Sequence, residues 1–304
     1  VRDSLVDWRE LILGDQSSLI LDKYHPYEDL PKMINPTSGY IFNTNNSPFN
    51  STAEFENLKE EDYNSTFSFM EEENNRSIRF MELIDEYEKL SYEDFKEIKY
   101  DQQYPDSILY IGNISQIFDL DKSEFPNYEN LIDLIQKWDR RGDIENIGAA
   151  QWSLYYSYML DLLSENDLSV KDTIDIKFHL DALEKTKDRL MKNFGKLDIR
   201  LGDIQRLVRG DKSLPVSGLI DMIAPTYSVP MEGGKVRAVS GESYIMLIKY
   251  SEDGPEVETI LPYGNSSNPS SPHYTDQMKM YTEKKLKKMS LDKDEILSEA
   301  VKIY

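Results

Sequence analysis

The spacing of apolar residues divides the chain into three regions. In residues 1–75, short apolar runs alternate with stretches of Asn, Ser, Pro and Asp, a pattern that predicts strands joined by long loops. Residues 76–231 repeat apolar side chains mostly at helical spacing, and residues 232–304 return to a strand-like pattern. We therefore predict an α+β fold in which a large helical region interrupts a sheet.

Apolar stripes with three- and four-residue spacing mark the expected helices. Ser91, followed three residues later by Asp94, predicts a capped helix start, and Gly195 predicts a helix end. The aromatic residues on these stripes are expected to lie in the core. The stripes run through Ile78 to Leu90, Leu131 to Trp138, Trp152 to Leu162 and Phe178 to Phe194.

The last region contains two expected strands. Ser243 to Ser251 is apolar on both faces in its middle, which predicts a strand buried between two layers, and Val257 to Leu261 alternates apolar and polar residues. Asp253-Gly254 between them is a hairpin signal, and Pro255 suggests a turn longer than two residues. We expect these strands to be antiparallel and to share a core with a strand at Tyr40 to Phe42, with the helices packed outside.

Composition limits the partners. The chain has 304 residues, of which 39% are apolar, so it can bury a substantial core. Its formal net charge of −21 repels phosphate backbones and anionic lipid surfaces, which argues against nucleic acid and membrane partners. No apolar run approaches the ~20 residues that a membrane-spanning helix needs.

Composition also limits the chemistry. The chain has no cysteine, which excludes disulfides, thiol catalysis and thiolate metal sites. The three histidines, His25, His179 and His273, are far apart and lack the spacing of zinc ligands. Ser271 and Asp276 flank His273, but neighbours this close in sequence seldom form a catalytic triad, so a structural role is expected for His273.

The densest polar motif is GYIFNTNNSPF, from Gly39 to Phe49. Uncharged amides at the end of a strand can donate hydrogen bonds to an oxygen that becomes negative during acyl transfer. Turns use the same residue types for local hydrogen bonds, and chemistry alone favours a turn here.

The motif resembles the segment of penicillin-acylase-family catalytic subunits that supplies the oxyanion-hole asparagine. Asn45 falls on that asparagine, whose side-chain NH₂ in the family contacts the oxyanion together with a backbone N–H from an earlier segment. The following NNRSIRFMELI resembles the family's helix that begins with an arginine close to the active site. Arg76 is the counterpart of that arginine.

Three later blocks carry the same resemblance, and the second of them resembles in particular the branch of homoserine-lactone and aculeacin acylases. They include a Trp-Asp segment, a Gly-Asp-x-Gln-Arg segment followed by Leu-Pro-Val, and a strand followed by Tyr-Gly and His-Tyr-x-Asp-Gln. Their order matches the family along most of the chain. The blocks are Lys137 to Trp152, Leu201 to Gly218 and Ser240 to Tyr281.

The resemblance implies part of an N-terminal-nucleophile hydrolase with a four-layer αββα core. In that family, autoproteolysis exposes a Ser that attacks an amide carbonyl while its own α-amine acts as the base. The family's nucleophile lies farther upstream than the 44 residues that precede Asn45 here. We therefore expect this chain to be the C-terminal part of a catalytic subunit, inactive alone, with the nucleophile segment and the α chain of the same precursor as partners.

The resemblance further implies a periplasmic or secreted acylase that acts on a small amide. Candidate substrates are a β-lactam side chain, an N-acyl-homoserine lactone and a lipopeptide. No cofactor is expected. Calcium is a structural ion in some relatives, but its carboxylates cannot be assigned in this sequence. The alternative is a noncatalytic scaffold or binding protein that retains the acylase fold, and an unrelated acidic helical adaptor is the third interpretation.

Overall fold

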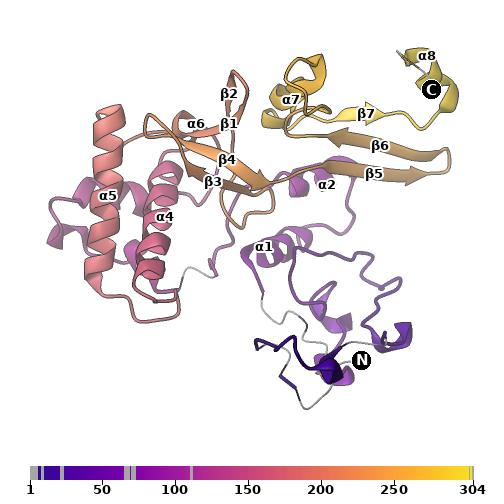
Figure 1. Cartoon of the computed structure of the whole chain (residues 1–304), viewed down its shortest axis with the longest axis horizontal. Coiled ribbons are helices and arrows are strands. Elements are labelled where there is room, and N and C mark those ends of the chain that lie inside the picture. Colours follow the sequence, from indigo (N-terminus) through magenta and orange to yellow (C-terminus); the bar gives the residue numbers. More distant parts are fainter. Residues whose placement is uncertain are drawn as a thin grey trace. The chain divides into compact units, whose positions relative to one another are not determined.

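Helices fill the middle of the chain and strands its last third (Figure 1). The computed structural model describes residues 6–7, 10–20, 24–64, 69, 73–109, 112–300 and 302. The α-helices are α1 (Asn75–Ile84), α2 (Tyr92–Lys99), α3 (Glu129–Gln136), α4 (Ala149–Glu165), α5 (Ile176–Phe194), α6 (Leu201–Ile204), α7 (Met278–Thr282) and α8 (Lys293–Glu299). The strands are β1 (Gln205–Arg209), β2 (Lys212–Pro215), β3 (Thr226–Pro230), β4 (Val236–Gly241), β5 (Ile245–Ser251), β6 (Gly254–Ile260) and β7 (Lys287–Met289). Short 3₁₀ helices are η1 (Ser17–Leu19), η2 (Tyr27–Asp29), η3 (Glu54–Glu56), η4 (Glu60–Asp62), η6 (Gly112–Phe118), η7 (Lys122–Glu124) and η8 (Pro272–Tyr274).

The helix signals of the sequence are largely confirmed. Ser91 and Asp94 form a reciprocal capping box at the start of α2, and α5 ends at Gly195 with φ of +71°. The first stripe is the exception, because α1 ends at Ile84 instead of continuing to Leu90. The backbone N–H of Tyr87 donates to Ile84 O, so the chain closes a tight turn there.

The main core lies between α3, α4 and α5. Trp152 and Tyr155 of α4 are buried, as expected for aromatic residues on an apolar stripe, and Trp152 stacks on Trp138 with ring centroids 5.8 Å apart. Gly148 precedes α4 with φ of +104°, and a β-carbon there would lie 2.7 Å from Trp138 Cβ. Only glycine combines that backbone conformation with so close an approach of the indole.

The predicted helical region ends earlier than expected. Strands β1, β2 and β3 lie between residues 205 and 230, which the apolar spacing assigned to helix, so that boundary is wrong. The reason is a hairpin: β1 and β2 pair from Arg206↔Pro215 to Arg209↔Lys212, joined by Gly210-Asp211. The resulting sheet has the order β2-β1-β4-β3, with β1 and β4 parallel.

The second sheet has the order β5-β6-β7 and is antiparallel, as predicted for the late strands. Ser251 pairs with Gly254, so the β5–β6 turn has two residues, and the expectation of a longer turn is wrong. Gly254 supplies the positive φ of +109°, while Pro255 is accommodated within β6. Strand β5 is not buried on both faces, because 45% of Met246 is exposed.

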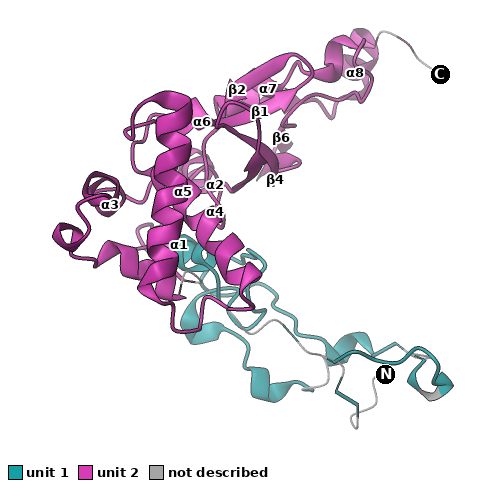
Figure 2. Ribbon diagram, turned by 60° about the vertical axis from the view of Figure 1, so that its left-hand side comes forward, with its two compact units in different colours: residues 1–81 teal, residues 82–304 magenta. Residues whose placement is uncertain are grey.

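Residues 1–81 and 82–304 form two compact units (Figure 2). In the described part of the first unit, the expected strand at Tyr40 to Phe42 is absent. Phe42 N–H donates to Ser51 O, and Thr52 Oγ1 donates to Tyr40 O at 2.8 Å. One backbone bond does not make a strand ladder.

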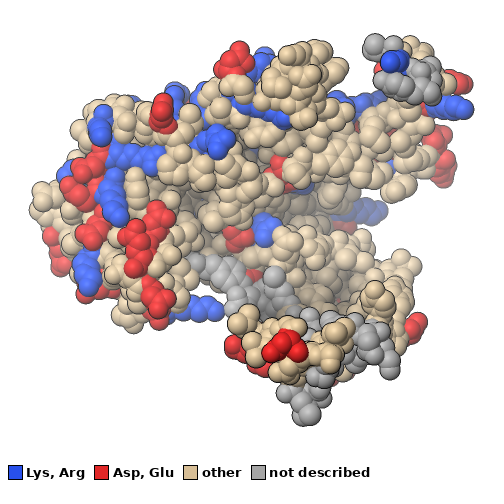
Figure 3. All heavy atoms as spheres, viewed as in Figure 1, with Lys and Arg blue, Asp and Glu red and all other residues tan. Residues whose placement is uncertain are grey.

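The surface carries both signs of charge. Acidic and basic side chains are interspersed on the face seen in Figure 3, although acidic residues exceed basic ones in the whole chain, 56 to 35. Among the described residues, no helix is both long enough and apolar enough to cross a bilayer.

Candidate active site around Asn45

Two aromatic side chains hold the Asn45 loop against α1. Tyr40 and Phe42, two residues apart, both contact Phe80 of α1. Phe42 stacks on Phe80 with centroids 4.4 Å apart, and Tyr40 meets the same ring edge-on at 6.0 Å. The alternating apolar positions that suggested a strand therefore serve to anchor a loop on a helix.

Asn46 forms the polar centre of the loop. Only 4% of it is exposed, and its Oδ1 accepts from the backbone N–H and the hydroxyl of Thr44, at 2.9 and 3.0 Å. Its Nδ2 donates to Ser47 O at 3.3 Å and to Asn50 O. Every hydrogen-bonding position of this amide is occupied by the loop itself, so Asn46 has a structural role.

Asn74 joins the loop to the helix. Its Nδ2 donates to Thr44 O at 2.9 Å, and its Oδ1 accepts from the backbone N–H of Ser77 at 2.9 Å. A side-chain oxygen that accepts from an N–H of the first helical turn is a helix cap. The same residue thus fixes the beginning of α1 and the backbone next to Asn45. This capping role of Asn74 was not predicted, although an Asn before a helical stripe is a recognised start signal.

Asn45 differs from its neighbours because it is exposed and adopts a left-handed backbone with φ of +66°. Arg76 Nη1 donates to Asn45 Oδ1 at 3.0 Å. A guanidinium has no acceptor, so the amide oxygen must face it and the NH₂ must face away. Within the described residues, Asn45 Nδ2 makes no hydrogen bond. The structure thus brings the two predicted site residues, 31 positions apart, into contact and leaves one amide donor available.

Positive charge lies close to Asn45 Nδ2. Arg76 is the second residue of α1, and the partial positive charge of a helix N-terminus adds to that of the guanidinium. The nearby Glu73 carboxylate accepts from the Ser77 hydroxyl at 2.5 Å. An amide donor beside positive charge suits an oxygen on which negative charge develops.

Glu56 stabilises the turn that precedes the loop. Its carboxylate accepts from the backbone N–H groups of Thr37 and Ser38, both at 2.7 Å. Desolvation raises the pKa of Glu56, but the hydrogen bonds from Ser38 and Thr37 outweigh it and lower this pKa to about 2. The carboxylate therefore remains charged throughout the neutral range.

His273 lies in a different setting. Its Nδ1 contacts Asp276 Oδ2 at 2.8 Å, but Ser271 Oγ accepts from the backbone N–H of His273 and caps η8. The serine hydroxyl is thus not positioned as a nucleophile activated by the imidazole. Across the described ranges, no group of three or more His, Cys, Asp or Glu side chains could hold a metal ion.

Other polar residues of the motif blocks serve as local braces. Asp139 Oδ1 accepts from Arg141 N–H at 3.0 Å and from Asn146 Nδ2 at 2.7 Å. Gln205, of which 1% is exposed, donates to the backbone oxygens of Val216 and Gly218. These blocks therefore maintain the fold around β1 and the loop before α4.

The sequence is similar to those of known acylases. A family model described as Penicillin amidase matches residues 3–298. The acyl-homoserine lactone acylase PvdQ of Pseudomonas fluorescens Pf-5 is 37% identical over 83 residues, 26% of this chain and 11% of that protein. The corresponding protein of Pseudomonas savastanoi pv. phaseolicola is 22% identical over 180 residues, 53% of this chain and 23% of that protein. Aculeacin-A acylase of Actinoplanes utahensis is 30% identical over 94 residues, 28% of this chain and 11% of that protein.

The fold has a solved counterpart. The thermostable penicillin G acylase from Alcaligenes faecalis superposes with a TM-score of 0.53 at 14% identity, over 100% of this chain and 63% of that chain. This chain therefore spans less than two thirds of that structure and matches a smaller share of its curated relatives. Because the family model covers nearly the whole sequence, the chain belongs to the penicillin amidase family.

Proposed function

We propose that this chain is part of an acylase that cleaves the amide bond of a small N-acyl substrate, and that Asn45 Nδ2 is a donor of its oxyanion hole. The observation that carries the proposal is the orientation of the Asn45 amide. Arg76 holds the oxygen at 3.0 Å, and the NH₂ faces away without a partner among the described residues. Arg76 is a positioning residue, because it acts through Asn45.

The chemistry follows from the family. A nucleophilic hydroxyl attacks the amide carbonyl, the carbonyl oxygen becomes an oxyanion, and the amine leaves with a proton. Asn45 Nδ2 donates to that oxygen most strongly when it is negative, which lowers the barrier for the chemical step. Water then attacks the acyl-enzyme, releasing the carboxylic acid and regenerating the hydroxyl.

The nucleophile is proposed to lie in an upstream segment of the same precursor, together with the α chain. The sheets described above would then belong to a four-layer αββα core completed by that segment. Relatives named for acyl-homoserine lactones, aculeacin A and penicillin G make amides with an apolar acyl group the first substrates to assay. A periplasmic or secreted location is part of the same proposal.

The test uses the full-length protein. Its mature N-terminal residue is identified by mass spectrometry, and its turnover is measured with N-acyl-homoserine lactones and a phenylacetyl amide. Ser, Thr or Cys at that position, with turnover that depends on it, supports the acylase. Any other residue, with no turnover, supports the noncatalytic scaffold.

A further inference from the structure

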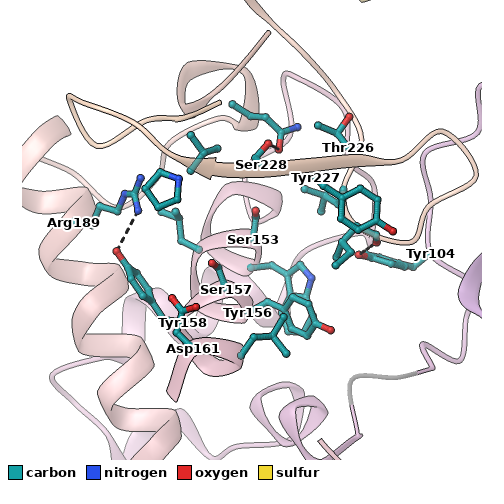
Figure 4. A pocket seen from close by; sticks show the side chains of 18 residues that line it. Tyr104, Ser153, Tyr156, Ser157, Tyr158, Asp161, Arg189, Thr226, Tyr227 and Ser228 are labelled. Carbon is teal, nitrogen blue, oxygen red and sulfur yellow. Dashed lines mark hydrogen bonds between the residues drawn. The ribbon is translucent and has the colours of Figure 1, made fainter. Parts of the chain in front are cut away.

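A cavity of about 180 Å³ lies between α4 and the β3 strand, within the second unit (Figure 4). Aromatic side chains form part of its walls, with Trp152 and Tyr156 from α4, Tyr227 from β3, and Tyr104 from the segment that follows α2. An apolar cavity of about 150 Å³ can hold a benzene molecule. The space therefore fits a small apolar group of roughly that size.

The polar groups on the two sides of the cavity differ. On the strand side, Ser228 Oγ donates to Gln205 Oε1 at 3.1 Å and Thr226 Oγ1 donates to Ser217 O at 2.8 Å, so these groups are occupied. On the α4 side, Ser153 and Ser157 lie under β3 in Figure 4, and their hydroxyls make no hydrogen bond to any described residue. A ligand can use these two hydroxyls without breaking an existing contact.

The third free hydroxyl belongs to Tyr156, which stacks on Trp152 with centroids 5.3 Å apart and likewise has no hydrogen-bond partner in the described residues. Burial, then Asp221 and Tyr227, raise the pKa of Tyr156 to about 12. Its hydroxyl is therefore protonated near neutral pH and can donate to a ligand.

Arg189 of α5 brings positive charge to the cavity. Its guanidinium donates to Gly234 O at 2.9 Å, to Lys235 O at 2.7 Å and to Tyr158 OH at 3.3 Å, the contact drawn in Figure 4. These bonds use three of five N–H groups, and no carboxylate pairs with Arg189 within the described chain. One N–H on each terminal nitrogen is left for an anion.

We infer that this cavity is a binding site for a small carboxylate with an apolar body, such as a short fatty acid or a substituted benzoate. The carboxylate would contact Arg189, the body would lie against Trp152 and Tyr156, and the serine hydroxyls of α4 would be further donors to the carboxylate oxygens. A guanidinium is the side chain best suited to a planar carboxylate. Exposed Asp161, which also lines the cavity, lies at its rim and disfavours a second negative charge.

The experiment is calorimetric titration of the full-length protein with hexanoate and benzoate, each compared with its uncharged amide. Tighter binding of the acid than of the amide, by about 10-fold or more, is expected from a charge-assisted hydrogen bond. Arg189→Met keeps the apolar stem and should remove this preference. Equal binding of acid and amide, or a preference that survives Arg189→Met, overturns the proposal.

Three further variants locate the site. Ser153→Leu fills the cavity and should abolish binding, while Ser164→Leu, on the same helix but outside the cavity, should not. Asp161→Asn should tighten binding of the acids. Binding that survives Ser153→Leu, or that weakens in Asp161→Asn, also contradicts the proposal. Amide-hydrolase turnover of Ser153→Leu should match the parent, so that failure of this site is distinguished from failure of the proposed acylase.

Discussion

Asn45 and Asn46 are adjacent, yet one is exposed with a left-handed backbone and the other is buried with a fully bonded amide. Arg76 holds only the first of them. The two residues are thus a natural pair for separating catalysis from folding.

Asn45→Asp tests the donor directly. The aspartate retains oxygens for Arg76 but replaces the NH₂ with an acceptor, so we expect a loss in kcat of about 10² to 10³-fold or more in the complete enzyme. Asn45→Gly should lose a similar factor without backbone strain, because glycine accepts φ of +66°. Steady-state kinetics and the melting temperature check both.

The matched control is Asn46→Ala. It deletes an amide with four loop contacts, so it should lower the free energy of unfolding by about 1 to 3 kcal/mol. Its effect on kcat at a temperature where the enzyme is folded should be much smaller than that of Asn45→Asp. The reverse order of kcat effects would show that Asn45 is not the donor.

Arg76→Ala tests the positioning of the Asn45 amide. Without the guanidinium the amide can rotate, and we expect kcat to fall by about 10 to 100-fold, the range of one charge-assisted hydrogen bond. KM should change little, and Arg76→Lys should recover part of kcat. An increase in KM with unchanged kcat would instead assign Arg76 to substrate binding.

The buried His179 should make stability depend on pH. Its ring is fully buried, Nδ1 lies 2.6 Å from Tyr155 OH, and burial lowers the pKa of His179. In the unfolded chain this pKa returns to about 6.5, so the unfolded state binds the proton first as pH falls. Stability therefore decreases as pH drops below about 6.5, with a slope of at most ~1.4 kcal/mol per pH unit from this group.

Unfolding by urea at pH 7.5 and 5.5 checks this prediction. His179→Phe retains an aromatic ring beside Tyr155 and removes the titration, so the stability lost between the two pH values should be smaller than in the parent. The quantity compared is the change in the free energy of unfolding between the two pH values. Its absolute value is not used, because the substitution also leaves the Tyr155 hydroxyl without its hydrogen-bond partner. An unchanged difference would rule out His179 as its source.

Gly148→Ala should be strongly destabilising. The new β-carbon would lie 2.7 Å from Trp138 Cβ and 3.0 Å from Leu134 O, at a φ that alanine rarely adopts. We expect a loss of about 3 kcal/mol or more in the free energy of unfolding. Gly195→Ala is the control, because it also has positive φ but no atom within 4 Å, and it should cost about 1 kcal/mol. Similar losses in the two variants would contradict the packing argument.

The sequence predicted the features that local spacing determines. The capping box at Ser91, the end of α5 at Gly195 and the core position of Trp152 all follow from residue type and periodicity. The apolar spacing does not predict the β1–β2 hairpin, because its strands are only five and four residues long. Apolar spacing over so few residues does not separate helix from strand.

The site required information that local spacing does not hold. Family resemblance indicates Asn45 and Arg76, and their contact depends on Asn74, which connects the loop to α1. Adjacent asparagines are chemically identical, so only the backbone conformation decides which amide turns inward and which outward. The strand expected at Tyr40 to Phe42 was wrong for a related reason, since alternating apolar residues also suit a loop that packs on one aromatic ring.

The β5–β6 hairpin has a consequence for handling the chain. β5 is an edge strand in the described sheet. Its own Met246 and Tyr250 are 45% and 78% exposed, and Tyr244, which precedes it, is 48% exposed. Unpaired N–H and C=O groups beside apolar side chains form a template on which another strand can add. Preparations of this segment by itself should therefore self-associate through β5 at high concentration, and a charged residue in place of Met246 should improve its solubility.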